Sequence, residues 1–184
     1  MPSPSSQSSQ SSQSSPPRTV QAYAPINIAL VKYWGKADED AMLPLNDSIS
    51  ITLTTEPADS ATPAANRLGT LTTITASPSS PSTDDSFCLN GTPHPLGTRI
   101  RRCLEVARAQ RGPAGADPRW PLRIESTNGV PTGAGLASSA SGMAALAVGL
   151  AALYAIAPAH VPMLARLGSG SACRSLAGDR KSVV

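Results

Sequence analysis

The sequence has 184 residues, with 15 Lys and Arg against 12 Asp and Glu, and so a formal net charge of +3. This weak positive balance lacks the dense basic stripe of a dedicated nucleic-acid-binding protein, so we expect no nucleic-acid partner. Hydrophobic residues make up 40% of the chain but aromatic residues only 3%, so Ala, Leu, Ile and Val must build the core. Three cysteines without Cys-x-x-Cys spacing and two histidines do not favour a zinc site.

The N-terminal segment consists almost entirely of Ser, Gln and Pro, which predicts a disordered tail over residues 1–18. It contains no apolar segment typical of a secretory signal. The longest apolar run, Ala140–Ile156, is shorter than the roughly 20 residues that span a membrane. We therefore expect no membrane partner and, with an odd cysteine count, a reducing cytoplasmic environment.

Order is expected from Thr19, and the first half of the chain favours strands. Short apolar runs and alternating apolar and polar residues carry this prediction. An Asn90-Gly91 pair after one of these runs indicates a tight hairpin turn. The predicted strands are Ile26–Val31, Ile49–Thr55, Leu68–Ala76, Phe87–Leu89 and Leu122–Ser126.

Helical periodicity dominates the second half. Apolar residues recur at helical spacing over Leu96–Arg111, and Gly112 and Pro113 end that helix. Ser139–Ala155 predicts a second, buried helix, and Val161–Leu167 a third, where a proline fits only the first turn. Strands followed by helices favour an α+β layer arrangement.

A Gly- and Ser-rich loop over residues 131–142 runs directly into the predicted buried helix. Gly133 and Gly135 allow backbone N–H groups to approach an anion, and the helix start adds unpaired N–H groups. Ser138 and Ser139 add hydroxyls for phosphate oxygens or Mg²⁺. The loop matches neither the Walker nor the Rossmann pattern. An ordinary connection remains the alternative.

A second small-residue run, Gly168-Ser-Gly-Ser-Ala-Cys-Arg-Ser175, carries a basic side chain. Arg174 offers a planar fork for phosphate or carboxylate. Nothing near Cys173 resembles a base, which favours a packing role for that thiol over a nucleophilic one. A flexible surface loop is the alternative for the whole run.

A third run, Asn27-Ile-Ala-Leu-Val-Lys-Tyr-Trp-Gly-Lys36, combines cations with aromatic rings. Lys36 could neutralise a diphosphate as a point charge. Tyr33 and Trp34 could equally be core or surface aromatics, and Asn27 beside a proline could be a turn residue.

Taken together, these runs resemble the GHMP small-molecule kinase superfamily, and within it diphosphomevalonate decarboxylase. The motifs appear in the family's order over roughly residues 20–178 and include Lys32-Tyr-Trp-Gly-Lys36 and Leu43-Pro-Leu-Asn-Asp-Ser-Ile-Ser50. The resemblance implies the α+β fold of a GHMP-kinase N-terminal domain (ribosomal protein S5 domain 2-like) over residues 19–178.

The resemblance also implies a reaction. The family uses ATP and Mg²⁺ to phosphorylate the tertiary hydroxyl of mevalonate 5-diphosphate, and loss of phosphate and CO₂ then gives isopentenyl diphosphate. This lyase step belongs to the mevalonate pathway of isoprenoid and sterol biosynthesis, and full-length members tend to be homodimers. Two alternatives stay open: another GHMP kinase, or a non-catalytic fragment that binds phosphate ligands.

Site residues carry over by position. The resemblance places Arg174 on the substrate carboxylate, Asn27 in support of that arginine, and Arg99 on the diphosphate. It assigns no metal-ligand residue. The implied ATP-phosphate residues are Gly133, Gly135, Ser138 and Ser139. The implied substrate-binding residues are Asn27, Tyr33, Trp34, Gly35, Lys36, Arg99, Ser169, Gly170, Ser171, Ala172, Cys173 and Arg174.

The sequence departs from the family pattern at several points. Gly133 stands for a usual Ala and Asp47 for a usual Ser, and the connection from Tyr154 to Gly168 looks short. After Gly178 the resemblance stops, and residues 179–184 look like a non-family ending. The family's catalytic Asp lies in a second half beyond this point, so we expect a truncated chain with exposed apolar surface and impaired activity.

Overall fold

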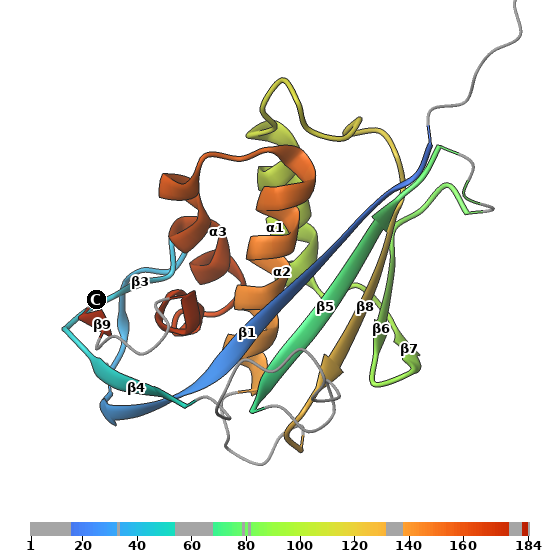
Figure 1. Ribbon diagram of the computed structural model, residues 1–184. Coiled ribbons are helices and arrows are strands. Elements are labelled where there is room, and N and C mark those ends of the chain that lie inside the picture. The colour runs from blue at the N-terminus through green and yellow to red at the C-terminus, as the bar shows by residue number, and fades with distance from the viewer. Residues whose placement is uncertain are drawn as a thin grey trace, which may run out of the picture.

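Among the described residues, a seven-stranded sheet forms one layer, and three α-helices cover one of its faces (Figure 1). The computed structural model describes residues 16–32, 34–53, 68–78, 80, 82–131, 138–176 and 182–183. The helical elements are α1 (Thr98–Ala109), α2 (Ser138–Tyr154), the 3₁₀ turn η2 (Pro158–His160), α3 (Val161–Gly168) and the 3₁₀ turn η3 (Ala172–Leu176).

The strand order in the main sheet is β7-β6-β8-β5-β1-β4-β9, and β2 and β3 form a separate hairpin. Among the described strands, only the β6–β8 pair is parallel. The α+β prediction is therefore confirmed. The strands are β1 (Arg18–Val31), β2 (Lys36–Asp38), β3 (Leu43–Pro44), β4 (Ile49–Leu53), β5 (Gly69–Ala76), β6 (Ser86–Leu89), β7 (Thr92–His94), β8 (Leu122–Asn128) and β9 (Ser182–Val183).

Strand β1 is longer than the sequence predicted. It begins at Arg18, which we had placed in the tail, and it continues through Pro25. Residues 18–25 pair with β5 on one edge, whereas residues 26–31 pair with β4 on the other. Pro25 lies where the pairing changes edges, so its missing N–H does not end the strand. Residues 1–15 of the predicted tail lie outside the described residues.

The β6–β7 hairpin confirms the predicted turn. Leu89 pairs with Thr92, which leaves Asn90 and Gly91 as a two-residue loop with φ of 50° and 79°. Two positive φ angles in succession are typical of a type I′ turn, which favours Asn followed by Gly.

Helix α2 is the buried helix that the sequence predicted, and it lies between the sheet and the other helices (Figure 1). Eleven of its 17 residues are buried. Small side chains let it approach the sheet closely: a Cβ built on Gly149 would lie 2.8 Å from Ile74 Cδ1 of β5. No helix among the described residues is long and apolar enough to cross a bilayer. Helices α1 and α3 also form within two residues of their predicted bounds.

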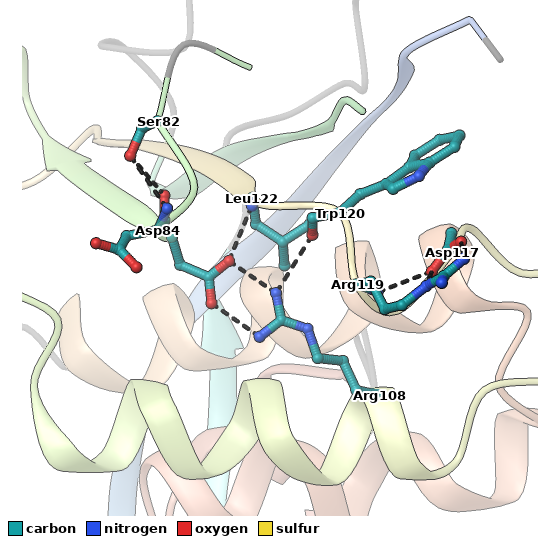
Figure 2. Close-up of polar contacts among 8 residues, drawn as sticks. Ser82, Asp84, Arg108, Asp117, Arg119, Trp120 and Leu122 are labelled. Carbon is teal, nitrogen blue, oxygen red and sulfur yellow. Dashed lines mark hydrogen bonds and ion pairs between the residues drawn. The ribbon is translucent and has the colours of Figure 1, made fainter. Parts of the chain in front are cut away.

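An ion pair ties the far edge of the sheet to α1 (Figure 2). Both Nη atoms of Arg108 donate to Asp85, at 2.7 and 2.8 Å, and Asp85 Oδ1 also accepts from the Leu122 N–H. These bonds join α1 to the entries of β6 and β8. The bonds from Asp85 raise the pKa of the Arg108 guanidinium.

Strand β4 has the reverse of the usual alternation. Ser50 and Thr52 point inward and are buried, whereas Ile49, Ile51 and Leu53 are 37–44% exposed. Leu30, Val31 and Leu45 are exposed nearby along the chain. The expected apolar surface is therefore present on the described residues.

The close packing of α2 predicts the effect of a single methyl group. A Cβ on Gly115 would overlap the backbone of Tyr154 at the end of α2, whereas a Cβ on Gly142 meets nothing within 4 Å. We expect Gly115→Ala to lower the free energy of unfolding by about 1–3 kcal/mol, because backbone cannot move aside like a side chain. Gly142→Ala, the matched control, should raise it by about 0.5–1 kcal/mol. Urea unfolding followed by circular dichroism measures both, and equal effects would contradict the packing argument.

Candidate functional site

Arg174 lies at the centre of a buried polar cluster. Its Nη1 donates to Ser48 Oγ at 2.6 Å, and its Nε donates to Asn27 Oδ1 at 3.3 Å. The Asn27 amide in turn donates to Ser175 Oγ at 2.6 Å and to the Ser171 carbonyl at 3.5 Å. We call these five residues the arginine cluster. Four elements or loops meet here: β1, the segment before β4, the residues before η3, and η3 itself.

The arginine cluster holds a cation without a counter-ion from the described residues. Arg174 is 5% exposed, and none of the ion pairs among the described residues includes it. A buried charge is costly unless an opposite charge or several hydrogen bonds compensate it. Asn27 and Ser48 accept two of its five N–H groups, so an anionic ligand would satisfy the site.

Asn27 and Arg174 therefore meet, as the resemblance implied, although the sequence did not single out Ser48. Ser48 lies within the motif Leu43–Ser50, which contributes to the family resemblance, but its contact with Arg174 could not be predicted from the sequence. The surface-loop alternative for 168–175 is wrong. Gly170, Ala172, Arg174 and Ser175 are buried, and η3 packs against α2, α3 and β1.

Cys173 fits the packing role. It is half-buried, its Sγ faces the Gly170 carbonyl at 3.8 Å, and burial raises the pKa of its thiol. Ser169 Oγ lies 3.5 Å from Ser171 Oγ at the end of α3. These residues shape the chain around Arg174.

A pocket of about 300 Å³ opens at the start of α2, and we call it the hydroxyl pocket. Polar side chains of β5, β8 and the first turn of α2 face apolar side chains of β6, α1 and α2. The structure thus groups Arg99 with Ser138 and Ser139, and not with the arginine cluster. Its lining residues are Thr70, Phe87, Leu89, Arg99, Ile100, Ser126, Asn128, Ser138, Ser139, Gly142, Met143, Leu146 and Gly168.

The hydroxyl pocket is suited to anions. Helix α2 has no acidic residue in its first turn, so the positive end of its dipole is not offset there. Its first N–H groups have no partner within the helix. Gly168 lines the pocket and is followed directly by the residues that lead to Arg174, so α3 joins the two parts of the site. Gly133 and Gly135 lie outside the described residues.

The end of the third predicted run leads from β1 into the β2–β3 hairpin, and Lys36 is the first residue of β2. Trp34 is 77% exposed, its N–H donates to Asn46 Oδ1 at 3.0 Å, and Gly35 has a φ of 83°. Lys36 forms an ion pair with Glu39, so it would have to exchange that carboxylate to bind a diphosphate. Tyr33 lies outside the described residues.

Two further observations bound the chemistry. The described part of the chain brings together no group of three His, Cys, Asp or Glu side chains that could hold a metal ion. A larger open depression of about 730 Å³ lies over the Asp85–Arg108 pair, and none of the sequence-predicted site residues lines it.

A largely antiparallel sheet with helices on one face defines an α+β domain, and the start of α2 and the buried Arg174 are two features suited to binding anions. The chain belongs to the diphosphomevalonate decarboxylase family. The family model for the diphosphomevalonate decarboxylase-like N-terminal domain matches residues 24–182.

Individual relatives agree. Diphosphomevalonate decarboxylase of Eremothecium gossypii is 45% identical over 165 residues, which are 84% of this chain and 38% of that protein. The mevalonate diphosphate decarboxylase of Enterococcus faecalis, solved in a study of ATP binding, is 40% identical with a TM-score of 0.67 over 87% of this chain and 45% of that one. A complex of MDDEF with MVAPP, the ATP analogue AMPPCP and magnesium has the same identity and TM-score, over 87% of this chain and 44% of that one. The chain spans 38–40% of the length of the first curated relatives.

The buried thiol of Cys103 and the half-buried thiol of Cys173 predict a labelling pattern. Burial raises the pKa of Cys103 to about 12 and raises that of Cys173 as well, so both thiols are protonated near neutral pH. We expect iodoacetamide at pH 7.5 to alkylate both far more slowly in the folded chain than in urea, because the thiolate is the reactive form. Mass spectrometry of a Cys88→Ser variant separates the two sites. Fast alkylation of Cys173 in the folded chain would contradict the packing role.

Proposed function

We propose that this chain provides the substrate-binding part of an ATP-dependent diphosphomevalonate decarboxylase, which converts mevalonate 5-diphosphate to isopentenyl diphosphate. The observation that carries the proposal is the buried Arg174 of the arginine cluster, which has no ion-pair partner among the described residues. The substrate carboxylate would supply the missing negative charge. Asn27 and Ser48 would fix the guanidinium before the substrate arrives, so that little reorganisation is needed on binding.

The two parts of the site divide the reaction. Phosphoryl transfer depends mainly on positioning and charge neutralisation, which the hydroxyl pocket offers through the start of α2, Arg99, Ser138 and Ser139. Lys36 and Arg99 would bind the substrate's diphosphate, and the substrate-binding segment would also include Tyr33, Trp34 and Gly35. Ser169 to Cys173 would shape the wall beside it. CO₂ leaves from the carboxylate at Arg174, which must orient that group without binding it more tightly than the transition state.

The residues that line the hydroxyl pocket are compatible with ATP and Mg²⁺ if the nucleotide phosphates supply most of the metal ligands. The serine hydroxyls and the N–H groups at the start of α2 can donate hydrogen bonds to phosphate oxygens. Gly133 and Gly135 precede these serines in the sequence. No carboxylate lines the hydroxyl pocket among the described residues. Mg²⁺ would therefore be held by nucleotide phosphates and a serine hydroxyl, and it would neutralise phosphate charge.

We further infer that the 184-residue chain alone does not complete the reaction. It spans 38–40% of its curated relatives, and the apolar face of β4 is exposed. A non-catalytic ligand-binding role for the isolated chain rests on the same two observations.

The three cysteines are free thiols, which supports a reducing, cytoplasmic environment.

Removing the Arg174 charge tests the carboxylate assignment. We expect Arg174→Gln to weaken mevalonate 5-diphosphate binding about ten- to a hundredfold. This is the usual effect of losing the charge-assisted hydrogen bonds between a guanidinium and a carboxylate. Isopentenyl diphosphate lacks the carboxylate, so its affinity should not change. Isothermal titration with both ligands measures this.

Arg166→Gln is the matched control, because Arg166 lies on the neighbouring α3 and donates to the Ala41 carbonyl. It should leave both affinities unchanged. An equal loss of both ligands in Arg174→Gln would show a general structural effect and contradict the assignment.

Turnover tests the reaction itself. Purified chain with Mg-ATP and mevalonate 5-diphosphate should release neither ADP nor CO₂. The same chain extended by the remaining part of a curated relative should release both in equal amounts, and Arg174→Gln in that extended protein should reduce both. ADP without CO₂ would identify a kinase of the superfamily instead. Both products from the chain alone would refute its dependence on a second part.

A further inference from the structure

A short chain of buried hydroxyl groups connects the sheet to the first turn of α2. Thr70 Oγ1 of β5 lies 2.8 Å from Asn128 Oδ1 of β8 and 2.8 Å from Ser141 Oγ of α2. Ser141 Oγ lies 3.1 Å from the Ser138 carbonyl oxygen. Thr70 and Ser141 are both fully buried, so water does not compete for these contacts.

Counting protons shows which of the three contacts is indispensable. Two hydroxyls supply only two protons for three contacts. Either Ser141 donates to Thr70 while Thr70 donates to Asn128, or Thr70 donates to Ser141 while Ser141 donates to the Ser138 carbonyl. Leaving both protons on the outer contacts would set two bare oxygens 2.8 Å apart. The Thr70–Ser141 hydrogen bond is therefore common to both favourable arrangements.

This bond holds the turn that presents the hydroxyl pocket's donors. Ser138 and Ser139 line the pocket from the first turn of α2, and a Cβ built on Gly142 would meet no atom of another element within 4 Å. In the first turn only Ala140 and Ser141 are buried, whereas from Ala144 the helix is buried almost without interruption. Among the described residues, the hydrogen bond at Ser141 is the polar link to the sheet nearest to the start of α2.

We propose that Thr70 and Ser141 are positioning residues, whose hydrogen bond fixes the first turn of α2 for nucleotide-phosphate binding. The inference rests on the proposed function, because it takes the hydroxyl pocket as the phosphate site. It adds that phosphate affinity depends on the hydrogen bond between Thr70, which lines the pocket, and Ser141, which is buried and does not line it. Neither hydroxyl needs to contact the reacting atoms.

The same strand offers a matched control. Thr72 Oγ1 lies 2.9 Å from Ser126 Oγ, and this pair is also buried, but it joins β5 to β8 and not to α2. Thr72→Val therefore removes one buried hydroxyl–hydroxyl bond of similar length without affecting the link to the helix. Thr70→Val removes the link, whereas Thr70→Ser keeps the hydroxyl and loses only a methyl group.

The first readout needs no ligand. The N–H groups of Gly142 and Met143 are the first in α2 that pair within the helix, with the carbonyls of Ser138 and Ser139. We expect Thr70→Val and Ser141→Ala to speed amide hydrogen exchange at these two residues about five- to tenfold, measured by NMR on the whole 184-residue chain. Thr72→Val should leave them unchanged. Unchanged exchange in Thr70→Val would overturn the inference.

The second readout is the affinity for Mg-AMPPCP, measured by titration. Thr70→Val and Ser141→Ala should each weaken binding about five- to tenfold, the double variant no more than either single one, and Thr70→Ser less than about twofold. Equal weakening by Thr70→Val and Thr72→Val would overturn the inference by showing a general loss of stability. The unsubstituted chain could bind no Mg-AMPPCP while Thr70→Val still speeds amide exchange in α2. That outcome would overturn the nucleotide role in the proposed function, but the effect of the Thr70–Ser141 bond on the first turn of α2 would stand.

Discussion

The close approach of α2 to the sheet is the constraint on which the rest of the structure depends. Because its buried positions are mostly Ala and Gly, the helix lies near β1 and β5, and Gly149 leaves room for Ile74. This short separation lets a threonine on β5 reach a serine on the helix at 2.8 Å. A helix with larger side chains would stand farther from the strands, and the start of α2 would lose that polar anchor. The small side chains on the buried face of α2 therefore determine the geometry at the start of that helix as well as the packing of the core.

Arg174 shows how the fold keeps a charge ready at a buried position. The guanidinium bonds to Asn27 from β1 and to Ser48 from the segment before β4, and both partners are neutral. A carboxylate in place of either would stabilise the arginine more strongly, but it would also compete with an anionic ligand. Neutral acceptors hold the side chain in place and leave its charge available. Burying a cation that has no ion-pair partner among the described residues lowers the stability of the fold.

The sequence predicted the helices, the hairpin turn and the family well, because periodicity, an Asn-Gly pair and long motifs are local signals. It failed where the answer depended on distant partners. The first half of β1 was missed because Pro25 suggests a break, and only the change of pairing edge explains how the strand continues. Ser48 belongs to a family motif, but the sequence could not show its role, because its partner Arg174 is 126 residues away along the chain. Arg99, which the resemblance assigns to the substrate diphosphate, lines the same pocket as Ser138 and Ser139, and this proximity across the fold was not readable from the sequence.

Strand β4 connects the site to the exposed surface. Alternate residues of a strand point to opposite faces, so placing Ser50 and Thr52 inward forces Ile49, Ile51 and Leu53 outward. The inward choice has a local reason: Thr52 Oγ1 lies 3.4 Å from the Arg174 carbonyl, and Ser48, two residues before Ser50, holds the guanidinium. A slip of one residue would bury the apolar side chains and move the polar ones away from Arg174. The register therefore favours the arginine cluster over the burial of β4, and the exposed apolar face of this chain follows from the chemistry of its site.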